Sequence, residues 1–287
     1  MLTATLARPA DASAANVARR IARAAIRSLH AELTLTAKPG LVCPGDNGSH
    51  SDMTAATLMR SLFSLRGYFG AIAMAAHRGA SFSELQQLGV AAEARMLRAT
   101  GGINAHRGAI FNLGLLAAAV AHRSAGGEPI TAGGLSDTVR VRWSAAICAA
   151  QPTASSHGLL VAARHGAGGA RLEAARGYPA VLELALPALR NALRRGLDTR
   201  RALLQTLFVL IAHLQDTNLL YRGGTDGLAF ARNAAMDFLA GGGTASAGWE
   251  RRAGTIRDAF VARNLSPGGA ADLLAATWFV HLVTHPS

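Results

Sequence analysis

Residues 38–53, KPGLVCPGDNGSHSDM, gather charged and polar side chains in a stretch rich in glycine and proline. Lys38 is the only lysine of the chain, and all its other basic positions are arginine. Arg107 in TGGINAHRG and Arg222 in DTNLLYRGG lie in similar polar stretches. An ammonium is a compact charge and a guanidinium is a planar fork, and both suit phosphate oxygens. These three cations are therefore candidates for binding phosphate, and a surface role of Lys38 is the alternative.

Glycine pairs stand in three of the polar stretches, at Gly101-Gly102, Gly223-Gly224 and Gly268-Gly269. Glycine lets backbone N–H groups come close to an anion, and a helix N-terminus adds a positive dipole. Each pair lies beside an arginine, asparagine or serine, so the three together indicate phosphate binding more strongly than one does. For any single pair, a turn without a ligand is the alternative. The uncharged candidates for phosphate contact are Gly101, Gly102, Asn104, Ser266, Gly268 and Gly269.

Carboxylates occur near the expected helix ends. Asp52 and Asp272 fall in first turns, where a carboxylate also stabilises the helix dipole without taking part in chemistry. Asp216 follows an apolar helix, where a negative charge is unfavourable, so we expect a partner for it. Mg²⁺ held by one or two carboxylates and by substrate phosphates would be such a partner, which makes these three aspartates the candidate metal ligands. Glu93, among alanines in AAEARM, is either paired or functional.

Several familiar catalytic patterns are missing. The sequence has no HExxH or Cys/His spacing for zinc, no Walker motif and no GxSxG. Its two cysteines do not indicate a disulfide framework. His50 and His106 are the histidines that lie within the polar stretches, which leaves them as candidates for acid–base work.

The composition favours packed helices. Half of the 287 residues are hydrophobic, only 5% are aromatic, and alanine and leucine dominate. Strand-like alternation is nearly absent. The sequence therefore predicts an all-α fold, a single compact multi-helix domain with Gly-rich functional loops at helix ends. Residues 1–12 are expected to be a flexible N-terminal tail and residues 13–287 the catalytic domain.

Apolar spacing and capping signals place the individual helices. Ser81 with Glu84 forms a capping box, Asp198 and Thr225 are candidate N-caps, and Ser266 precedes a proline at the first helical position. The predicted helices cover 16–33, 53–78, 81–98, 110–122, 135–150, 199–214, 225–239 and 266–283. The stretches 38–51, 100–108 and 216–227 are expected to be loops, and 151–180 to be irregular with short helices.

The net charge of +12 suggests an anionic partner, although an arginine-rich composition alone would also explain it. A basic helical nucleic-acid binder is one hypothesis. The charge is scattered and not interleaved with aromatic residues, so we expect no nucleic-acid partner. The apolar runs are too short for a membrane span and the N-terminus lacks an apolar signal core, so we expect a cytoplasmic protein without membrane contact.

Five motifs, in order along the chain, resemble those of the triphosphoribosyl-dephospho-CoA synthase family: KPGLVCPGDNGSHSDM, AEARMLRATGGINAHRGAIFNLGLL, GARLEAARGYP, DTNLLYRGG and NLSPGGAADLLA. The resemblance runs from about Glu32 to about Leu282. The form CPGDNGSHSDM, with SLFSLRGYF downstream, looks more like the malonate decarboxylase branch than the citrate lyase branch. Ala105 stands where the family usually has threonine, so a role of that hydroxyl does not carry over, whereas Arg107 keeps the charge of the family's lysine.

The resemblance implies an all-helical enzyme that joins ATP to 3′-dephospho-CoA. The ribose 2′-hydroxyl of dephospho-CoA would attack C1 of the ATP ribose, and adenine would leave while the triphosphate is retained. The product would be the precursor of a prosthetic group, passed to a phosphoribosyl-dephospho-CoA transferase that acts on an acyl-carrier subunit. With this chemistry, Glu93 is the candidate general base, and His106 or His50 would assist.

Some alternatives stay open at this point. A Mg²⁺-dependent N-glycosidic hydrolase of the ADP-ribose type would use the same acids with water as acceptor. The same synthase reaction could serve citrate lyase. Each candidate carboxylate is compatible with metal binding and with the role of the base, and a homodimer is a further hypothesis.

Overall fold

The computed structural model describes residues 9–150, 161 and 168–285, and this part of the chain contains helices and loops without a β-strand. The all-α prediction is confirmed. The helices and short turns, in chain order, are α1 (Pro9–Thr34), α2 (Ala55–Ser64), α3 (Arg66–His77), α4 (Phe82–Thr100), α5 (Arg107–Ala125), α6 (Ala132–Ala149), α8 (Gly169–Ala175), the π-helix η1 (Ala180–Ala185), α9 (Leu186–Arg194), α10 (Thr199–His213), α11 (Thr217–Ala240), the 3₁₀ turn η2 (Gly243–Ala245), α12 (Trp249–Ala262) and α13 (Gly268–Thr284).

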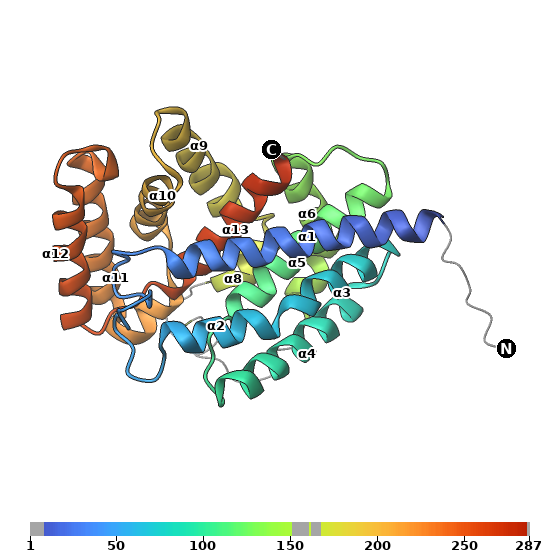
Figure 1. Cartoon of the computed structure of the whole chain (residues 1–287), viewed down its shortest axis with the longest axis horizontal. Helices are drawn as coiled ribbons and strands as arrows, with labels where there is room; N and C mark the ends of the chain where they lie inside the picture. Colours follow the sequence, from blue (N-terminus) through green and yellow to red (C-terminus); the bar gives the residue numbers. More distant parts are fainter. Residues whose placement is uncertain (1–8, 151–160, 162–167, 286–287) are drawn as a thin grey trace.

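Helices α5 and α13 form the centre of the molecule, and α1 runs along them (Figure 1). Helix α5 packs against α1, α3, α6 and α13, and nearly all its residues from Ala109 to Ala121 are buried. A run of alanines, Ala117–Ala119, is fully buried in this helix. Small side chains allow neighbouring helices to approach closely, so this composition permits α5 to be surrounded on all sides.

Local signals predicted some helix ends correctly and missed others. The capping box at Ser81 and the Asp198 N-cap are confirmed. The helix predicted over 53–78 is instead two helices that meet at Leu65. The stretch 216–227, predicted as a loop, is the beginning of α11, which is broken by non-helical backbone at Gly224, next to the predicted cap Thr225.

Two further boundaries differ from prediction. Helix α13 begins at Gly268 with Pro267 as N-cap, and Ser266 lies outside it without capping it. At the other end of the chain, α1 already begins at Pro9, inside the segment expected to be a tail, while residues 1–8 lie outside the described part. Much of 151–180 also lies outside it, and its described remainder contains α8 and the start of η1.

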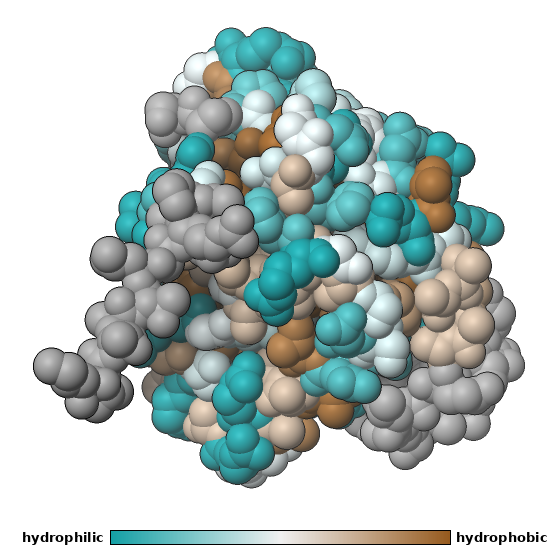
Figure 2. Space-filling view, turned by 90° about the vertical axis from the view of Figure 1, so that its right-hand side faces the viewer, coloured by the Kyte–Doolittle hydropathy of each residue, from teal (hydrophilic) through white to brown (hydrophobic). Residues whose placement is uncertain are grey.

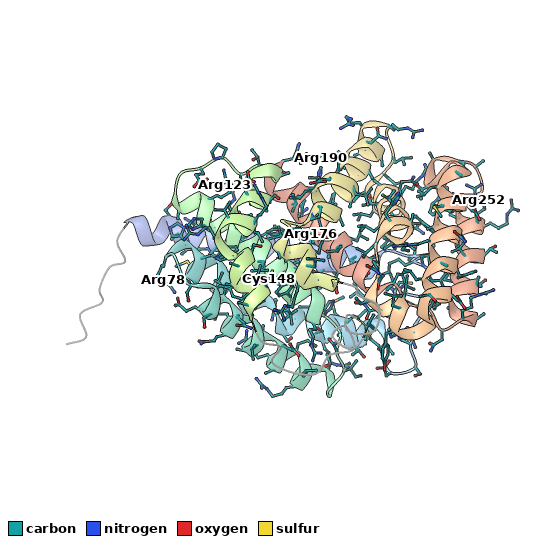
Figure 3. All side chains as sticks on the ribbon, turned by 180° about the vertical axis from the view of Figure 1, so that it is seen from behind. Arg78, Arg123, Cys148, Arg176, Arg190 and Arg252 are labelled. Atoms are coloured by element: carbon teal, nitrogen blue, oxygen red, sulfur yellow. The ribbon has the colours of Figure 1, made fainter. Side chains whose placement is uncertain are left out.

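The surface is mixed in character. On the face in Figure 2, hydrophobic areas are small and interrupted by hydrophilic ones. From behind, the labelled arginines Arg78, Arg123, Arg176, Arg190 and Arg252 are spread from one end of the molecule to the other (Figure 3). The positive charge of this side is thus dispersed. None of the helices described is long and apolar enough to cross a bilayer.

Candidate active site

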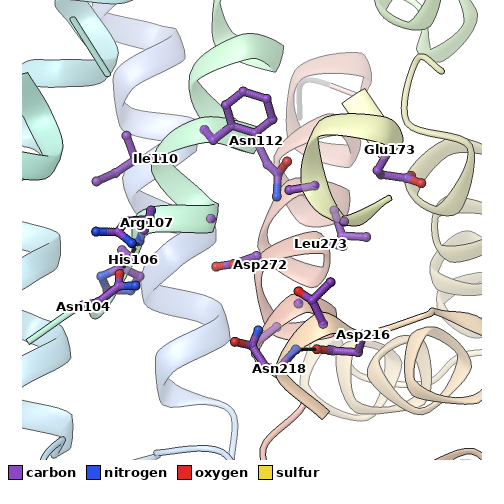
Figure 4. Close-up of a pocket in the computed structure, with 18 of the residues that line it drawn as sticks. Asn104, His106, Arg107, Ile110, Asn112, Glu173, Asp216, Asn218, Asp272 and Leu273 are labelled. Carbon is purple, nitrogen blue, oxygen red and sulfur yellow. Dashed lines mark hydrogen bonds between the residues drawn. The ribbon is translucent and has the colours of Figure 1, made fainter. Parts of the chain in front are cut away.

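A cavity of about 1170 Å³ lies between α5 and α13 and is also lined by the end of α1, the loop 41–53, α4, α8 and the start of α11. Pockets for one small molecule usually measure roughly 300–1,000 Å³, so this cavity lies just above the usual range. Figure 4 shows several of its side chains directed inward from these elements. The predicted residues that line it are His50, Asp52, Glu93, Asn104, His106, Arg107, Asp216, Arg222, Ser266, Gly268, Gly269 and Asp272.

Three predicted residues are not brought to this cavity: Lys38, Gly101 and Gly102. Gly101 and Gly102 end α4 with left-handed backbone, φ 70° and 90°, and the N–H of each donates to the Leu97 carbonyl. Such a left-handed helix end favours glycine whether or not a ligand is present. The structure therefore explains this pair by helix termination.

Lys38 is buried, with 1% of its surface exposed. Its ammonium lies 2.5 Å from a Glu32 carboxylate oxygen and donates to the Glu32 carbonyl at 2.7 Å. Glu32, near the end of α1, itself lines the cavity. Lys38 is thus placed behind the cavity wall, where it holds a carboxylate that faces the ligand space.

His50 links the loop 38–53 to α11 and to the segment before α13. Arg222 donates to His50 Nδ1 at 3.2 Å, and His50 Nε2 lies 2.9 Å from Ser266 Oγ. Burial lowers the pKa of His50, and the Arg222 guanidinium lowers it further. Because an arginine only donates, neutral His50 accepts at Nδ1 and carries its proton on Nε2, which donates to Ser266. Both ring nitrogens are therefore engaged.

The loop is fixed in this place by close backbone contacts. Ser49 Oγ donates to the Leu265 carbonyl at 2.6 Å, and Arg222 donates to the Ser49 carbonyl at 2.7 Å. A Cβ on Gly40, where φ is 63°, would lie 1.9 Å from the Leu265 oxygen, so only glycine fits there. The glycines of the loop thus bring His50 against Ser266.

In another part of the wall, Arg107 and Glu93 form an ion pair between α5 and α4. The Arg107 Nε donates to Glu93 Oε1 at 2.6 Å, and its terminal nitrogen contacts the same oxygen. Both side chains are partly exposed to the cavity. Asn104 Oδ1 accepts from the Arg107 backbone N–H at 3.2 Å, which fixes the beginning of α5.

His106, immediately before α5, is 4% exposed. Its Nδ1 lies 2.6 Å from Ser61 Oγ, and its Nε2 has no hydrogen-bond partner among the described residues. Burial lowers the pKa of His106 to about 4, with Lys38 as a smaller cause. The imidazole is therefore neutral at pH 7, with one ring nitrogen unpaired in the cavity wall.

Asp216 joins the N-termini of two helices. Its Oδ1 accepts from the Asn218 N–H at 2.8 Å in α11, and its Oδ2 accepts from the Ala270 N–H at 2.8 Å in α13. The expectation that Asp216 follows a helix end unfavourably is wrong, because it is the N-cap of α11. Burial raises the pKa of Asp216, and the backbone N–H groups oppose this shift.

Asp272 reaches from α13 to the beginning of α5. A Cβ on Gly108 would lie 1.9 Å from Asp272 Oδ2, so the missing side chain makes room for this carboxyl. Burial raises the pKa of Asp272 well above its usual range, and the charges of Glu32 and Asp216 raise it further. In Figure 4, Asp272 points into the cavity between α5 and α13.

Comparison with known proteins decides the family. Residues 18–287 match the sequence profile of the CitG family, described as "ATP:dephospho-CoA triphosphoribosyl transferase". The chain belongs to this family. It is 43% identical to the "2-(5''-triphosphoribosyl)-3'-dephosphocoenzyme-A synthase" of Pectobacterium atrosepticum, covering 93% of this chain and 88% of the relative. No solved structure matches it.

Other relatives carry the same kind of name. A protein of Acinetobacter calcoaceticus, named "Probable 2-(5''-triphosphoribosyl)-3'-dephosphocoenzyme-A synthase", is 39% identical over 93% of this chain and 92% of its own length. One from Stutzerimonas stutzeri with that name is 38% identical over 99% and 97%. The triphosphoribosyl transferase family is thus matched along almost the whole chain.

The aspartates fit a magnesium ion only when a ligand supplies further oxygens. Within the described ranges, no three His, Cys, Asp or Glu side chains converge as metal ligands. Asp216 already accepts backbone N–H groups with both oxygens, and Asp52 is 65% exposed. Asp272 faces the cavity beside two other acids, where a cation would offset their repulsion. Mg²⁺ that arrives on a nucleotide suits such a partial site.

The sequence reasoning missed cavity residues that lie inside regular helices. Glu32 and Asn112 are buried in α1 and α5, and Asn218 lies in the first turn of α11. Glu173, in α8, accepts from the Ala180 N–H at 2.7 Å and has a pKa raised by burial. Asn112, Glu173 and Asn218 lie within quoted motifs without being named as site residues. Glu32 lies outside the motifs, and its only signal is a polar side chain near the end of a helix.

Proposed function

We propose that the chain joins ATP to 3′-dephospho-CoA, giving 2′-(5″-triphosphoribosyl)-3′-dephospho-CoA and adenine. The observation that supports this most is the cavity itself, which is larger than the usual pocket for one small molecule and is lined by Arg107 of α5 and Arg222 of α11. It also contains a carboxyl cluster, formed by Glu32, Asp216 and Asp272. Two nucleotides bring a triphosphate and a diphosphate, for which such arginines are suited. The names of the relatives agree with this reaction.

The residues suggest how the transfer would proceed. Arg107 of α5 and Arg222 of α11 would each bind phosphate groups, with Ser266, Gly268 and Gly269 as further contacts. When a phosphate takes Arg107 from Glu93, that carboxylate becomes free to accept the proton of the attacking 2′-hydroxyl. The bond from the hydroxyl oxygen to C1 forms as the bond from C1 to N9 of adenine breaks. Adenine takes up one proton at a ring nitrogen as it leaves, which balances the proton that Glu93 accepts. Asp272, in the centre, would lie near the charge that develops at C1.

Magnesium is part of this proposal as an ion carried by the triphosphate. Asp272 is the cavity carboxyl best placed to reach it, and Asp52 and Asp216 are the secondary candidates. When bound, the ion would neutralise phosphate charge next to the acidic cluster.

We further propose that the product serves malonate decarboxylase, on the form of the CPGDNGSHSDM motif. Citrate lyase is the second candidate, since both systems would use the same precursor. Incubating the product with the phosphoribosyl-dephospho-CoA transferase and apo acyl-carrier subunit of each system would show which one is loaded.

The test of the reaction is adenine release from ATP and Mg²⁺, with and without 3′-dephospho-CoA, together with the mass of the nucleotide product. Release that requires dephospho-CoA, with a product heavier by one triphosphoribosyl group, would support the synthase. Release without the acceptor would indicate a hydrolase that uses water, the alternative suggested by the same acids. No release in either mixture would contradict both.

A further inference from the structure

Asn112 is a buried polar residue in the cavity wall for which the described part of the chain offers no complete set of partners. It lies in α5, 2% exposed, and its Oδ1 accepts no hydrogen bond there. Buried side-chain oxygens are nearly always paired, and an unpaired one disfavours the folded state. Such an atom in a ligand cavity therefore indicates a partner that comes with the ligand.

Asn112 lies close to Asp272 of the carboxyl cluster. Asn112 follows Gly108 by four residues in α5, so the two lie on one face of the helix, about one turn apart. Gly108 is where Asp272 meets α5. Figure 4 shows the Asn112 side chain directed into the cavity above Asp272. A group bound to Asn112 is thus next to the acids.

Apolar side chains also line the cavity on the helices that carry Asn112 and Asp272. Leu115 follows Asn112 by three residues in α5, and Leu273 follows Asp272 in α13. The Tyr178 hydroxyl donates to the Asn112 backbone carbonyl at 3.4 Å, so the backbone carbonyl is satisfied and only the amide remains. A primary amide in an apolar wall offers one acceptor and donors in a plane.

We propose that Asn112 recognises the 6-amino edge of an adenine base, and that it is a specificity-determining residue of the transferase. Its Oδ1 accepts from the N6 amino group while its Nδ2 donates to N7, the pairing that asparagine makes with adenine. A 6-oxo purine presents acceptors at both O6 and N7, so Oδ1 faces an acceptor in either orientation of the amide. Since ATP and 3′-dephospho-CoA both carry adenine, either could supply this edge. The inference rests on the proposed function.

The experiment compares wild type with Asn112→Leu, which has a similar volume and no amide. Turnover is measured with ATP or ITP at constant 3′-dephospho-CoA, and then with ATP and the inosine analogue of dephospho-CoA. We expect Asn112→Leu to lower kcat/KM for the adenine substrate about 10- to 100-fold, as for two lost hydrogen bonds, and to leave the inosine substrate nearly unchanged. Asn233→Leu, at an exposed position of α11, is the control.

The melting temperature separates recognition from a structural role. Because Oδ1 has no hydrogen-bond partner among the described residues, Asn112→Leu should melt at or above the wild-type temperature. A variant that melts lower and binds both purines equally less well would show a structural residue and overturn the proposal. If Asn112→Leu does not fold, Asn112→Ser is used for the same ratio.

The outcomes are distinguishable. No adenine release by the wild type would contradict the proposed function itself. If the wild type is active but Asn112→Leu and Asn112→Ser keep its preference for adenine over inosine in both substrates, the role of Asn112 alone is overturned. A preference lost only in the ATP arm, or only in the dephospho-CoA arm, would support the proposal and identify which adenine is bound.

Discussion

Lys38 shows how its surroundings change the expected effect of removing a cation. Lys38→Met would leave the Glu32 carboxylate buried without its partner, so we expect the free energy of unfolding to fall by about 3–5 kcal/mol. Urea unfolding measures this loss, and Glu32→Gln added to Lys38→Met should recover part of it. Arg140→Met, which breaks an exposed ion pair with Asp137, should cost at most about 1 kcal/mol. Wild-type stability with weakened ATP binding would instead favour direct phosphate contact by Lys38.

Glu93 has two roles that kinetics can separate. If it is the general base, Glu93→Gln lowers kcat about 10²- to 10⁴-fold with little change in KM for ATP. If its main role is to orient Arg107, the variant raises KM and leaves kcat nearly unaltered. We expect the first result, measured by steady-state adenine release. Glu250→Gln, at an exposed position of α12, is the matched control.

The lowered pKa of His106 makes the stability of the folded chain depend on pH in a known direction. Its pKa is lowered from the ordinary 6.5 to about 4, so between these values the unfolded chain binds more protons than the folded one. The stabilisation is present above pH 6.5 and is lost as the pH falls towards 4. We expect the wild type to melt above His106→Asn at neutral pH, and this difference in melting temperature to shrink as the pH falls from 6.5 to 4. Calorimetry at a series of pH values measures it. A constant difference from pH 7 to pH 4 would show that His106 is not buried in the neutral form.

At the scale of elements, the beginning of α5 is fitted to a carboxyl of α13. Gly108→Ala would place a methyl group 1.9 Å from Asp272 Oδ2, so the carboxyl must move. We expect kcat to fall on the order of 10²-fold, as for a misplaced catalytic group, with a small change in melting temperature. Gly133→Ala in α6 meets nothing within 4 Å and should stabilise by about 0.4–1 kcal/mol with normal turnover. Equal activity of both variants would exclude Asp272 from the reaction.

The elements also show what a sequence can predict. The Ser81 and Asp198 caps depend on residues three positions apart, and both were predicted correctly. Asp216 and Ser266 were misplaced, because their partners, Ala270 and His50, are distant in sequence. Local sequence signals therefore predict where helices begin. A side chain such as Asp216, which binds the N-termini of two helices, is placed by the packing of those helices and is not predicted from nearby residues.

The same division applies to the site. Residues in glycine-rich stretches, such as Arg107 and Arg222, were recognised because unusual polar composition marks them. Glu32 and Asn112 follow helical periodicity, so from sequence they are indistinguishable from residues that are merely near the core. Burial without a hydrogen-bond partner is a property of the folded chain, and it identified Asn112 only in three dimensions.

At the scale of the whole molecule, the cavity walls include Glu32 in α1 and Leu273 in α13, so the first and the last helix both contribute to it. A ligand that binds only the folded state adds about 2.7 kcal/mol at 100 times its Kd. In a chain of this size that is roughly 5 °C in melting temperature.

We expect ATP with Mg²⁺ and 3′-dephospho-CoA each to raise the melting temperature in a single transition, measured by calorimetry. The chain has a net charge of +12 and the nucleotides are anions, so non-specific charge neutralisation must be separated from binding in the cavity. Sodium chloride at equal ionic strength is the control, and it should give a smaller shift. Two transitions, of which the nucleotides move only one, would show that the helices around the cavity do not unfold as one unit, because a ligand held by both α1 and α13 must stabilise both.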